Sequence, residues 1–346
     1  MTIPETVEAR LVEALEPIRQ YVLATSIYHM FESGVFDELS DPEGKRVEDL
    51  AGHLAFDERR LSTLLQFLVN EGLVCCADGR FGLTQKGRSY SDFRGWYTMM
   101  IGGYGSTFLQ VGDKLKRGSG SASRVAKQVG IGSCGISHYD SIPLTRRLMA
   151  KIPGGVKSML DLGCGNGLYL VEFCKAVPEL EAWGAEPDSA GYEAAVALVE
   201  REQLAHRIHL SCAGAREFLQ TAKEFTPDMT VLGFVLHEIL GQDGEDGVLA
   251  FLGELTGRYP DIHLIVIEVD ARMDDPGVMR HGLALAYYNA YYLLHPFTNQ
   301  RLESRAFWTA LFARAGLEIL ATDGVDPSVD STGLELGFLL RRSKTL

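Results

Sequence analysis

Apolar positions recur at helical spacing near the start of the chain. The apolar residues that share this spacing are Leu11, Leu15, Ile18, Val22, Ile27 and Phe31. Gly34 follows them, and glycine commonly ends a helix because it adopts left-handed backbone angles without steric cost. The pattern therefore predicts a long helix that stops just before Gly34.

Two further helices and a hairpin are predicted directly after this segment. The run VEDLAGHLAFDERRLSTLLQFLVNEGLV predicts two helices around a short turn, and VCCADGRFGLTQKG predicts two short strands joined by a DG turn at residues 78–79. Helix, turn, helix and hairpin together indicate a winged helix. Its second helix starts with DERR at Asp57, which has no excess positive charge for DNA phosphates. We therefore favour dimerisation or substrate covering over DNA recognition.

From Lys157 the pattern changes to short apolar runs alternating with helical segments. The apolar runs are SMLDLG, AWGAE, IHLSC, MTVLGFV and HLIVIEV, followed by EILAT and ELGFLLR near the end. Helical segments such as SAGYEAAVALVERE separate the early runs, which indicates a parallel sheet built from βαβ units. Only a Gly/Asp-rich turn separates the last two runs. We expect these two to pair antiparallel, because the turn is too short for a helical crossover.

A chain of 346 residues exceeds the size that one hydrophobic core usually spans. We expect a winged-helix domain over residues 1–95, connecting helices and a loop over 96–150, and an α/β domain over 151–346. The segment DKLKRGSGSASRVAKQVGIGSCGIS, residues 113–137, is rich in Gly and Ser. It is predicted to be either a plain linker or a mobile cover for an active site.

Composition and charge exclude several classes of protein. With 46% hydrophobic and 23% charged residues, the chain is neither disordered nor a disulfide scaffold. A net charge of −13 argues against nucleic acid or an acidic membrane as a partner. The acidic start differs from a signal peptide, and no apolar run is long enough to cross a bilayer, so a cytoplasmic location is expected. The six cysteines lack a CxxC pair and are predicted to be reduced, mostly buried thiols.

The most specific motif is DLGCGNG, residues 161–167, between an apolar run and the predicted helix LYLVEFCKAV. Its glycines let the backbone approach a ligand, and the helix start offers free N–H groups, but such a string also fits a nicotinamide or flavin site. Asp161 would attract a cationic ammonium and sulfonium rather than a pyrophosphate. Glu186, at the end of the second run, is placed to accept both ribose hydroxyls. These neighbours favour S-adenosylmethionine.

The predicted cofactor site includes residues from several segments. They are Tyr139, Asp161, Gly163, Gly165, Asn166, Glu186, Pro187, Gly214, Ala215 and Phe234. Gly214 and Ala215 follow the third apolar run, where adenine contacts usually lie. Tyr139 is expected either to pack near the sulfonium or to have a structural role.

Two histidines and a carboxylate form a second candidate constellation. His237 and Glu238 follow the fourth apolar run, at the strand end where open α/β sheets bind ligands, and His295 comes much later in YYNAYYLLHPFTNQ. Facing one cavity, these side chains would match the ligand set of a non-haem iron or catalytic zinc site. A buried histidine is more often a hydrogen-bonded core residue, and sequence separation does not show whether the two meet. Both interpretations stay open.

The front segment, DLGCGNG, Glu186 and the seven apolar runs together resemble the class I methyltransferases of the small-molecule O-methyltransferase type, over essentially the whole chain. Within that group, His237, Glu238 and His295 resemble the enzymes that methylate the β-carbon of 2-oxo acids. The phenylpyruvate branch has His-Asp at both places, where this chain has His-Glu and His-Pro. The segment QYVLATSIYHMFESGVFDEL is nearer to the 2-ketoarginine branch.

The resemblance implies a Rossmann-like α/β fold, a seven-stranded sheet with its last strand antiparallel, and an N-terminal winged-helix dimerisation domain in a homodimer. It also implies transfer of a methyl group from S-adenosylmethionine to the β-carbon of a small-molecule 2-oxo acid, whether 2-ketoarginine-like, branched-chain or aromatic. A zinc or iron ion held by His237, Glu238 and His295 would stabilise the enolate. The pocket-lining side chains Tyr287, Tyr288, Tyr291 and Phe297 would select among these acids, in directions that the sequence does not show.

Other residues are assigned to substrate and catalysis. Arg124 is expected either to bind the substrate carboxylate or to have a structural role. Glu268 and Asp270, which end the fifth run, are expected to act as a base or a guanidinium partner, or to cap the strand. The alternative enzyme is an O-methyltransferase in which His237 or His295 is a general base and no metal is needed. A third class, a DNA-binding sensor of S-adenosylmethionine, is disfavoured by the acidic charge.

Overall fold

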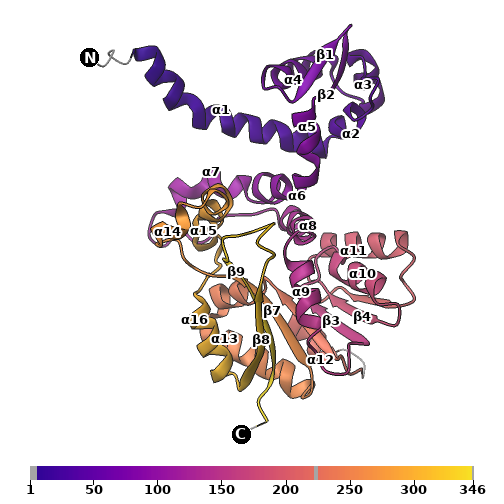
Figure 1. Ribbon diagram of the computed structural model, residues 1–346, viewed down its shortest axis with the longest axis vertical. Helices are drawn as coiled ribbons and strands as arrows, with labels where there is room; N and C mark the ends of the chain where they lie inside the picture. Colours follow the sequence, from indigo (N-terminus) through magenta and orange to yellow (C-terminus); the bar gives the residue numbers. More distant parts are fainter. Residues whose placement is uncertain (1–5, 222–224, 345–346) are drawn as a thin grey trace. The chain divides into compact units, whose positions relative to one another are not determined.

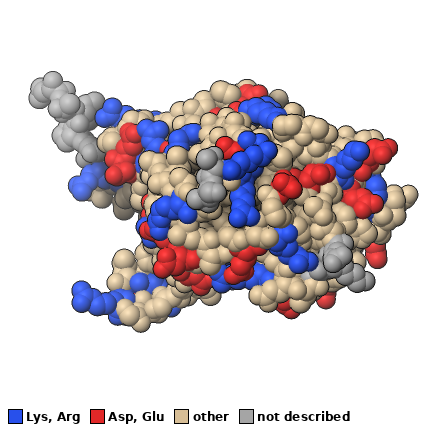
Figure 2. Space-filling model, turned by 90° about the horizontal axis from the view of Figure 1, so that it is seen from below, with Lys and Arg blue, Asp and Glu red and all other residues tan. Residues whose placement is uncertain are grey.

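The computed structural model describes residues 6–221 and 225–344, which fall in two compact units divided between Gly102 and Gly103. No helix within the described ranges is long and apolar enough to span a membrane. Basic and acidic side chains are interspersed on the face shown in Figure 2, so the described residues there form no extended basic patch.

The first unit is mainly helical. Its elements are α1 (Val7–Glu32), α2 (Val35–Leu39), α3 (Val47–Leu54), α4 (Glu58–Asn70), β1 (Val74–Ala77), β2 (Arg80–Leu83), α5 (Gln85–Ser89), η1 (Ser91–Phe93), α6 (Arg94–Tyr97) and the π-helix η2 (Thr98–Gly103), which ends at the boundary. The predicted first helix is confirmed as α1, and Gly34 follows its end with a φ of 79°.

The helix–turn–helix and hairpin of the first unit are also as predicted. Asp57 caps α4 by accepting the N–H of Arg60, so the DERR segment serves to start a helix. Asp78 and Gly79 both adopt positive φ, 52° and 74°, and close the β1–β2 hairpin, as expected of the two-residue turns that match strand twist. The core of this unit lies between the C-terminal part of α1 and helices α2 to α4.

The second unit contains the sheet. Its elements are α7 (Gly105–Lys114), α8 (Ala126–Ser137), α9 (Ser141–Met149), β3 (Ser158–Leu162), α10 (Leu168–Ala176), β4 (Glu181–Ala185), α11 (Ser189–Arg201), β5 (Ile208–Ser211), α12 (Ala215–Thr221), β6 (Met229–Gly233), α13 (Leu236–Arg258), β7 (His263–Val269), α14 (Pro276–Met279), η3 (Ala284–Tyr288), α15 (Asn289–Leu294), η4 (His295–Thr298), α16 (Arg305–Arg314), β8 (Leu317–Gly324) and β9 (Glu335–Arg342). The strand order is β5-β4-β3-β6-β7-β9-β8.

This sheet confirms the predicted fold class. β3 to β7 run parallel, and β9 is antiparallel to both β7 and β8, as the short connection between the last two runs required. Helices lie on both faces (Figure 1). Successive residues of one strand enter opposite cores: Met159 packs with α9, α10 and α11, whereas Leu160 packs with α12, α13 and α16.

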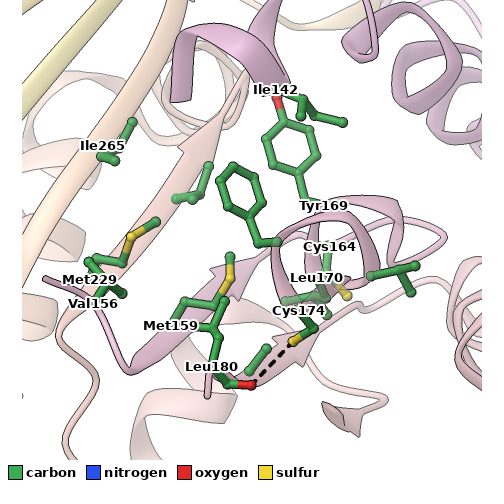
Figure 3. Close-up of a cluster of buried hydrophobic side chains, with 14 of the residues drawn as sticks. Ile142, Val156, Met159, Cys164, Tyr169, Leu170, Cys174, Leu180, Met229 and Ile265 are labelled. Carbon is green, nitrogen blue, oxygen red and sulfur yellow. Dashed lines mark hydrogen bonds between the residues drawn. The ribbon is translucent and has the colours of Figure 1, made fainter. Parts of the chain in front are cut away.

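The first of these cores, part of which is shown in Figure 3, also contains hydrogen bonds. The hydroxyl of Tyr169 lies 2.5 Å from the hydroxyl of Ser141 on α9, and the thiol of Cys174 lies 3.6 Å from the carbonyl of Leu180. All six cysteines are free, but only Cys164 and Cys174 are buried, so the prediction that the thiols are mostly buried was wrong. These contacts fix α9 and α10 against the sheet.

The Gly/Ser-rich connection contains a helix and makes hydrogen bonds within the second unit. Residues 126–137 form helix α8 despite three glycines, because Val129 packs closely against Gly103. The preceding loop is tied down by the N–H of Ala122, which donates to Phe297 at 2.6 Å, and by the hydroxyl of Thr107, which donates to Ser123. The segment is thus a packed part of the second unit.

Candidate active site

The glycine motif lies between β3 and α10, as the sequence predicted. Gly163, Gly165 and Gly167 all adopt positive φ, 89°, 55° and 76°, which turns the chain sharply at the carboxyl end of the strand. The N–H groups of Gly163 and Cys164 donate to the carbonyl of Ala185, so the loop is tied to the end of β4. This is where open α/β sheets bind ligands.

Two carboxylates lie beside this loop. Glu186 accepts the N–H of Gly165 through one oxygen and the N–H of Asp188 through the other, both at 2.9 Å. Burial, and then the charge of Glu186, raise the pKa of Asp161 to about 7, and burial raises the pKa of Glu186 as well. Neither carboxylate forms an ion pair within the described part of the chain. A cationic ligand would relieve their repulsion.

The other predicted cofactor residues are spread around the same edge of the sheet. Pro187 follows Glu186, Gly214 and Ala215 stand at the start of α12, and Phe234 follows β6 with a φ of 58°, an uncommon angle for a residue with a side chain. Tyr139 lies between α8 and α9. Their contacts with a cofactor stay predictions.

Helix α8 covers the glycine loop. The thiol of Cys134 lies 3.5 Å from the position that a Cβ on Gly165 would take, and it is hydrogen-bonded to the backbone at Asn166. This position of Cys134 was not predictable, since a lone cysteine in a Gly/Ser-rich segment has no characteristic partner.

His237 and Glu268 form a buried pair across the ends of β6 and β7. Glu268 is fully buried, and its oxygens lie 3.1 Å from the backbone nitrogen of His237 and 2.8 Å from its ring Nδ1. A carboxylate only accepts, so Nδ1 carries the proton and Nε2 is the ring nitrogen that can accept a proton. Burial lowers the pKa of His237, but the charge and hydrogen bond of Glu268 outweigh it, and the pKa is raised above its ordinary value.

His295 does meet His237, which the sequence left open. The two ring centroids are 5.1 Å apart, and His295 donates from Nδ1 to the carbonyl of Tyr291 at 2.5 Å. Burial, and then the neighbouring His237, lower the pKa of His295 well below its ordinary value. His295 is therefore a neutral side chain beside the pair.

A polar network extends from His237. Arg124 donates to Glu238 at 2.9 Å and to the hydroxyl of Tyr104 at 3.3 Å. Gln300 donates to the same Glu238 oxygen at 2.8 Å, and its Nε2 lies 3.4 Å from Nε2 of His237. Burial raises the pKa of Glu238, but the hydrogen bond and charge of Arg124 lower it overall. Arg124 is thus held in place near His237 and His295.

The side chains of His237, Glu238 and His295 do not form the predicted three-ligand metal site in this structure, and the bound metal ion stays a prediction. Glu238 is held by Arg124 and Gln300, and it follows His237 directly on α13, where consecutive side chains point in different directions. Among residues 6–221 and 225–344, no three His, Cys, Asp or Glu side chains are placed to hold a metal ion. We therefore derive no step through a metal.

The structure also decides between the alternative roles predicted for Glu268 and Asp270. Glu268 orients His237, so it is not available as a guanidinium partner. Asp270 accepts the N–H of Arg305 at 2.8 Å and thus caps α16. Tyr104 and Gln300 were missed, because neither belongs to a motif and both reach the site only through the fold. A pocket of about 400 Å³, lined in part by Tyr292 and His295, opens beside Gln300.

Comparison with known proteins identifies the family, although no protein-family model matches the chain. The chain is 41% identical over 343 residues to 2-ketoarginine methyltransferase of Streptomyces arginensis, and the alignment covers 98% of each protein. The chain belongs to this methyltransferase family. The predicted enzyme class, S-adenosylmethionine-dependent methyltransferase, is therefore confirmed.

Solved structures show the same fold in other methyltransferases. Human N-acetylserotonin methyltransferase in complex with S-adenosylmethionine has a TM-score of 0.66 at 16% identity, covering 99% of this chain and 100% of that one. Mitomycin 7-O-methyltransferase has a TM-score of 0.65 at 18% identity, covering 97% and 99%. This methyltransferase thus shares its fold with these enzymes over nearly its whole length.

Proposed function

We propose that this methyltransferase transfers the methyl group of S-adenosylmethionine to the β-carbon of a 2-oxo acid. The observation that supports it best is the 41% identity, over nearly the full chain, to an enzyme named for a 2-oxo acid, 2-ketoarginine. The buried pair of His237 and Glu268 supplies the base that such chemistry needs.

The cofactor is proposed to bind at the carboxyl ends of β3 and β4. Its ammonium and sulfonium charges would relieve the repulsion between Asp161 and Glu186, whose pKa values are both raised. The ribose hydroxyls would donate to Glu186, since each carboxylate oxygen can accept more than the one backbone N–H that it has here.

The chemical step is proposed to begin at His237. Its Nε2 removes a proton from the β-carbon, and the electrons of that C–H bond pass into the enolate of the 2-oxo group. The enolate β-carbon then attacks the sulfonium methyl, and the S–CH₃ electrons return to sulfur to give S-adenosylhomocysteine. His237 releases its proton to solvent. Glu268 stabilises the imidazolium and holds the ring in the correct tautomer.

Arg124 is proposed to bind the carboxylate of the substrate. Only Nη1 of its guanidinium is used, for Glu238 and Tyr104, so Nε and Nη2 have no hydrogen-bond partner among the described residues. A guanidinium can bind a carboxylate through two parallel hydrogen bonds, which would fix the 2-oxo group beside His237.

The experiment uses methyl-labelled S-adenosylmethionine with a panel of 2-oxo acids and catechols, with and without a chelator, and locates the methyl by mass spectrometry and NMR. The proposal predicts a methyl on the β-carbon of a 2-oxo acid. A methyl on oxygen of a catechol would overturn it and leave O-methylation with a histidine base. Loss of activity in chelator alone would show that our metal-free account of the enolate is incomplete.

We also propose that the protein is a homodimer in the cytoplasm, as predicted from sequence. The N-terminal half of α1 presents apolar side chains to solvent within the described chain, with Leu11, Leu15 and Ile18 between 51% and 60% exposed. Such a stripe is typical of an interface. Analytical ultracentrifugation should find a dimer that Leu15→Asp with Ile18→Asp converts to monomer; a wild-type monomer would refute this.

A further inference from the structure

Three carboxyl groups, which we call the carboxyl cluster, gather at a place that the proposed reaction does not use. Asp140 precedes α9, Asp330 lies in the connection between β8 and β9, and Glu335 is the first residue of β9. Asp330 and Glu335 are only 6% and 3% exposed. Lys, Arg and His form no ion pair with any of the three within the described ranges. Buried charges without a partner are costly, so their presence requires a reason.

One of these carboxyl groups has an open acceptor. Asp330 accepts the hydroxyl of Tyr288 at 2.6 Å and the N–H of Thr332 at 2.8 Å. Glu335 is hydrogen-bonded to Asp140, but its other oxygen, Oε1, is buried with no hydrogen-bond partner among the described residues. Native proteins rarely leave a buried carboxylate oxygen in this state.

Burial and mutual repulsion disfavour the charged form of these carboxyl groups in the absence of a cationic partner. Burial, and then the charges of Asp140 and Asp330, raise the pKa of Glu335 well above its ordinary value. Burial also raises the pKa of Asp140 to about 6. A metal ion is not indicated, because the described residues hold no three-ligand cluster. An organic cation with several N–H donors would satisfy the open oxygen and the repelling charges together.

A row of aromatic rings joins the carboxyl cluster to the base. Tyr288, which donates to Asp330, lies 6.4 Å from Tyr291 between ring centroids. Tyr291 lies 4.0 Å from His295, which lies 5.1 Å from His237. The carboxyl cluster and the base thus stand at opposite ends of one row of rings. An elongated substrate that lies along this row would place its far end at the carboxyl groups.

We propose that Asp140, Asp330 and Glu335 bind a guanidinium group at the far end of the substrate, so that the enzyme selects 2-oxo acids with a guanidinium side chain. This inference rests on the proposed function. A guanidinium is planar, keeps its charge at all working pH values and offers five N–H donors, which suits several carboxylate oxygens better than a compact ammonium. The substrate named for the 41% identical relative, 2-ketoarginine, has such a group.

The test compares two substrates that differ only in charge. One is 2-ketoarginine, and the other is its ureido analogue, in which oxygen replaces a terminal nitrogen and the charge is lost. Glu335→Gln keeps a donor for Asp140, so folding should be retained, and thermal melting checks this. We expect kcat/KM for 2-ketoarginine to fall about 10- to 100-fold in this variant, with the ureido analogue little changed. Asp330→Asn should shift the preference in the same direction.

Asp326→Asn is the matched control, because Asp326 is an exposed carboxylate of the same connection and loses the same charge. This variant should leave the ratio of kcat/KM for 2-ketoarginine to kcat/KM for the ureido analogue unchanged. The inference is overturned if wild type treats both substrates alike, or if Glu335→Gln weakens both equally.

A binding measurement separates this inference from the proposed reaction. Calorimetry with n-propylguanidinium and the enzyme bound to S-adenosylhomocysteine tests the carboxyl cluster without any 2-oxo group. We expect binding to wild type and its loss in Glu335→Gln. If propylguanidinium binds but no 2-oxo acid is methylated, the cluster is supported and the proposed function fails. If 2-oxo acids are methylated without preference for the guanidinium, the proposed function stands and this inference fails.

Discussion

Two buried carboxyl groups lie on neighbouring strands and have opposite surroundings. Glu268 on β7 pairs with Leu336, and Val269 pairs with Glu335, so the two carboxyl residues belong to adjacent rungs of the β7–β9 ladder. Glu268 uses both oxygens on His237, whereas Glu335 has one open oxygen and faces two further carboxyl groups. The first carboxyl group is satisfied within the protein and tunes a base, whereas the second keeps one oxygen without a partner, which we assign to the substrate guanidinium.

The largest expected effect comes from removing the base. His237→Ala should lower kcat/KM by about 10²- to 10⁴-fold, the usual contribution of general base catalysis. Affinity for S-adenosylmethionine should change little, because the glycine loop is on another strand. His206→Ala removes an exposed histidine and is the control for this change. Activity that persists in His237→Ala would show that Glu268 supports structure alone.

Neutralising Glu268 should have the next largest effect. In Glu268→Gln we expect kcat/KM to fall about 10- to 100-fold, as for the loss of one charge-assisted hydrogen bond. His237 must be neutral to accept a proton, so activity rises with pH through its pKa, which Glu268 raises. Without that charge the pKa falls, and the rising limb of the pH profile should move to lower pH. If the rising limb of the pH profile stays at the same pH in Glu268→Gln, the ionisation of His237 does not control activity.

Asp161→Asn tests the proposed cofactor site. As at the carboxyl cluster, the carboxyl groups there have no cationic partner among the described residues. We expect S-adenosylmethionine to bind about 10- to 100-fold more weakly, measured by calorimetry. The free enzyme should instead become more stable at pH 8, by about 5 °C.

The sign of this stability change follows from the raised pKa of Asp161. A carboxyl group with a folded-state pKa of about 7 contributes stability that is complete below its ordinary value of 3.8 and is lost as pH rises through 7. Asn has no such loss, so the variant should gain over wild type at pH 8 and not at pH 4. An equal difference in melting temperature at both pH values would contradict the assignment.

The fold was predictable from sequence because local signals agreed with the tertiary structure. The seven apolar runs became the seven strands, and the DG turn and Gly34 stand where backbone geometry demands them. The glycine-rich run 126–137 was harder, since its helix is imposed by packing that composition does not reveal.

The site was only partly predictable. His237 and Glu186 follow strands, and such positions converge at one edge of a parallel sheet whatever the loops do. The partner of His237, Glu268, was named without its role. Glu238 was predicted as a metal ligand, whereas in this structure it accepts hydrogen bonds from Arg124 and Gln300. Gln300 and Glu335 were missed, since their importance comes from long-range contacts alone.

The most direct test of the central claim is proton exchange at the β-carbon. The enzyme bound to S-adenosylhomocysteine is incubated with 2-ketoarginine in D₂O, and deuterium at the β-carbon is followed by NMR. The account predicts exchange well above the uncatalysed rate in wild type and its loss in His237→Ala, with exchange retained in His206→Ala. Enzyme-dependent exchange that survives His237→Ala, or no exchange in wild type while methyl transfer proceeds, would contradict the assignment of His237 as the base.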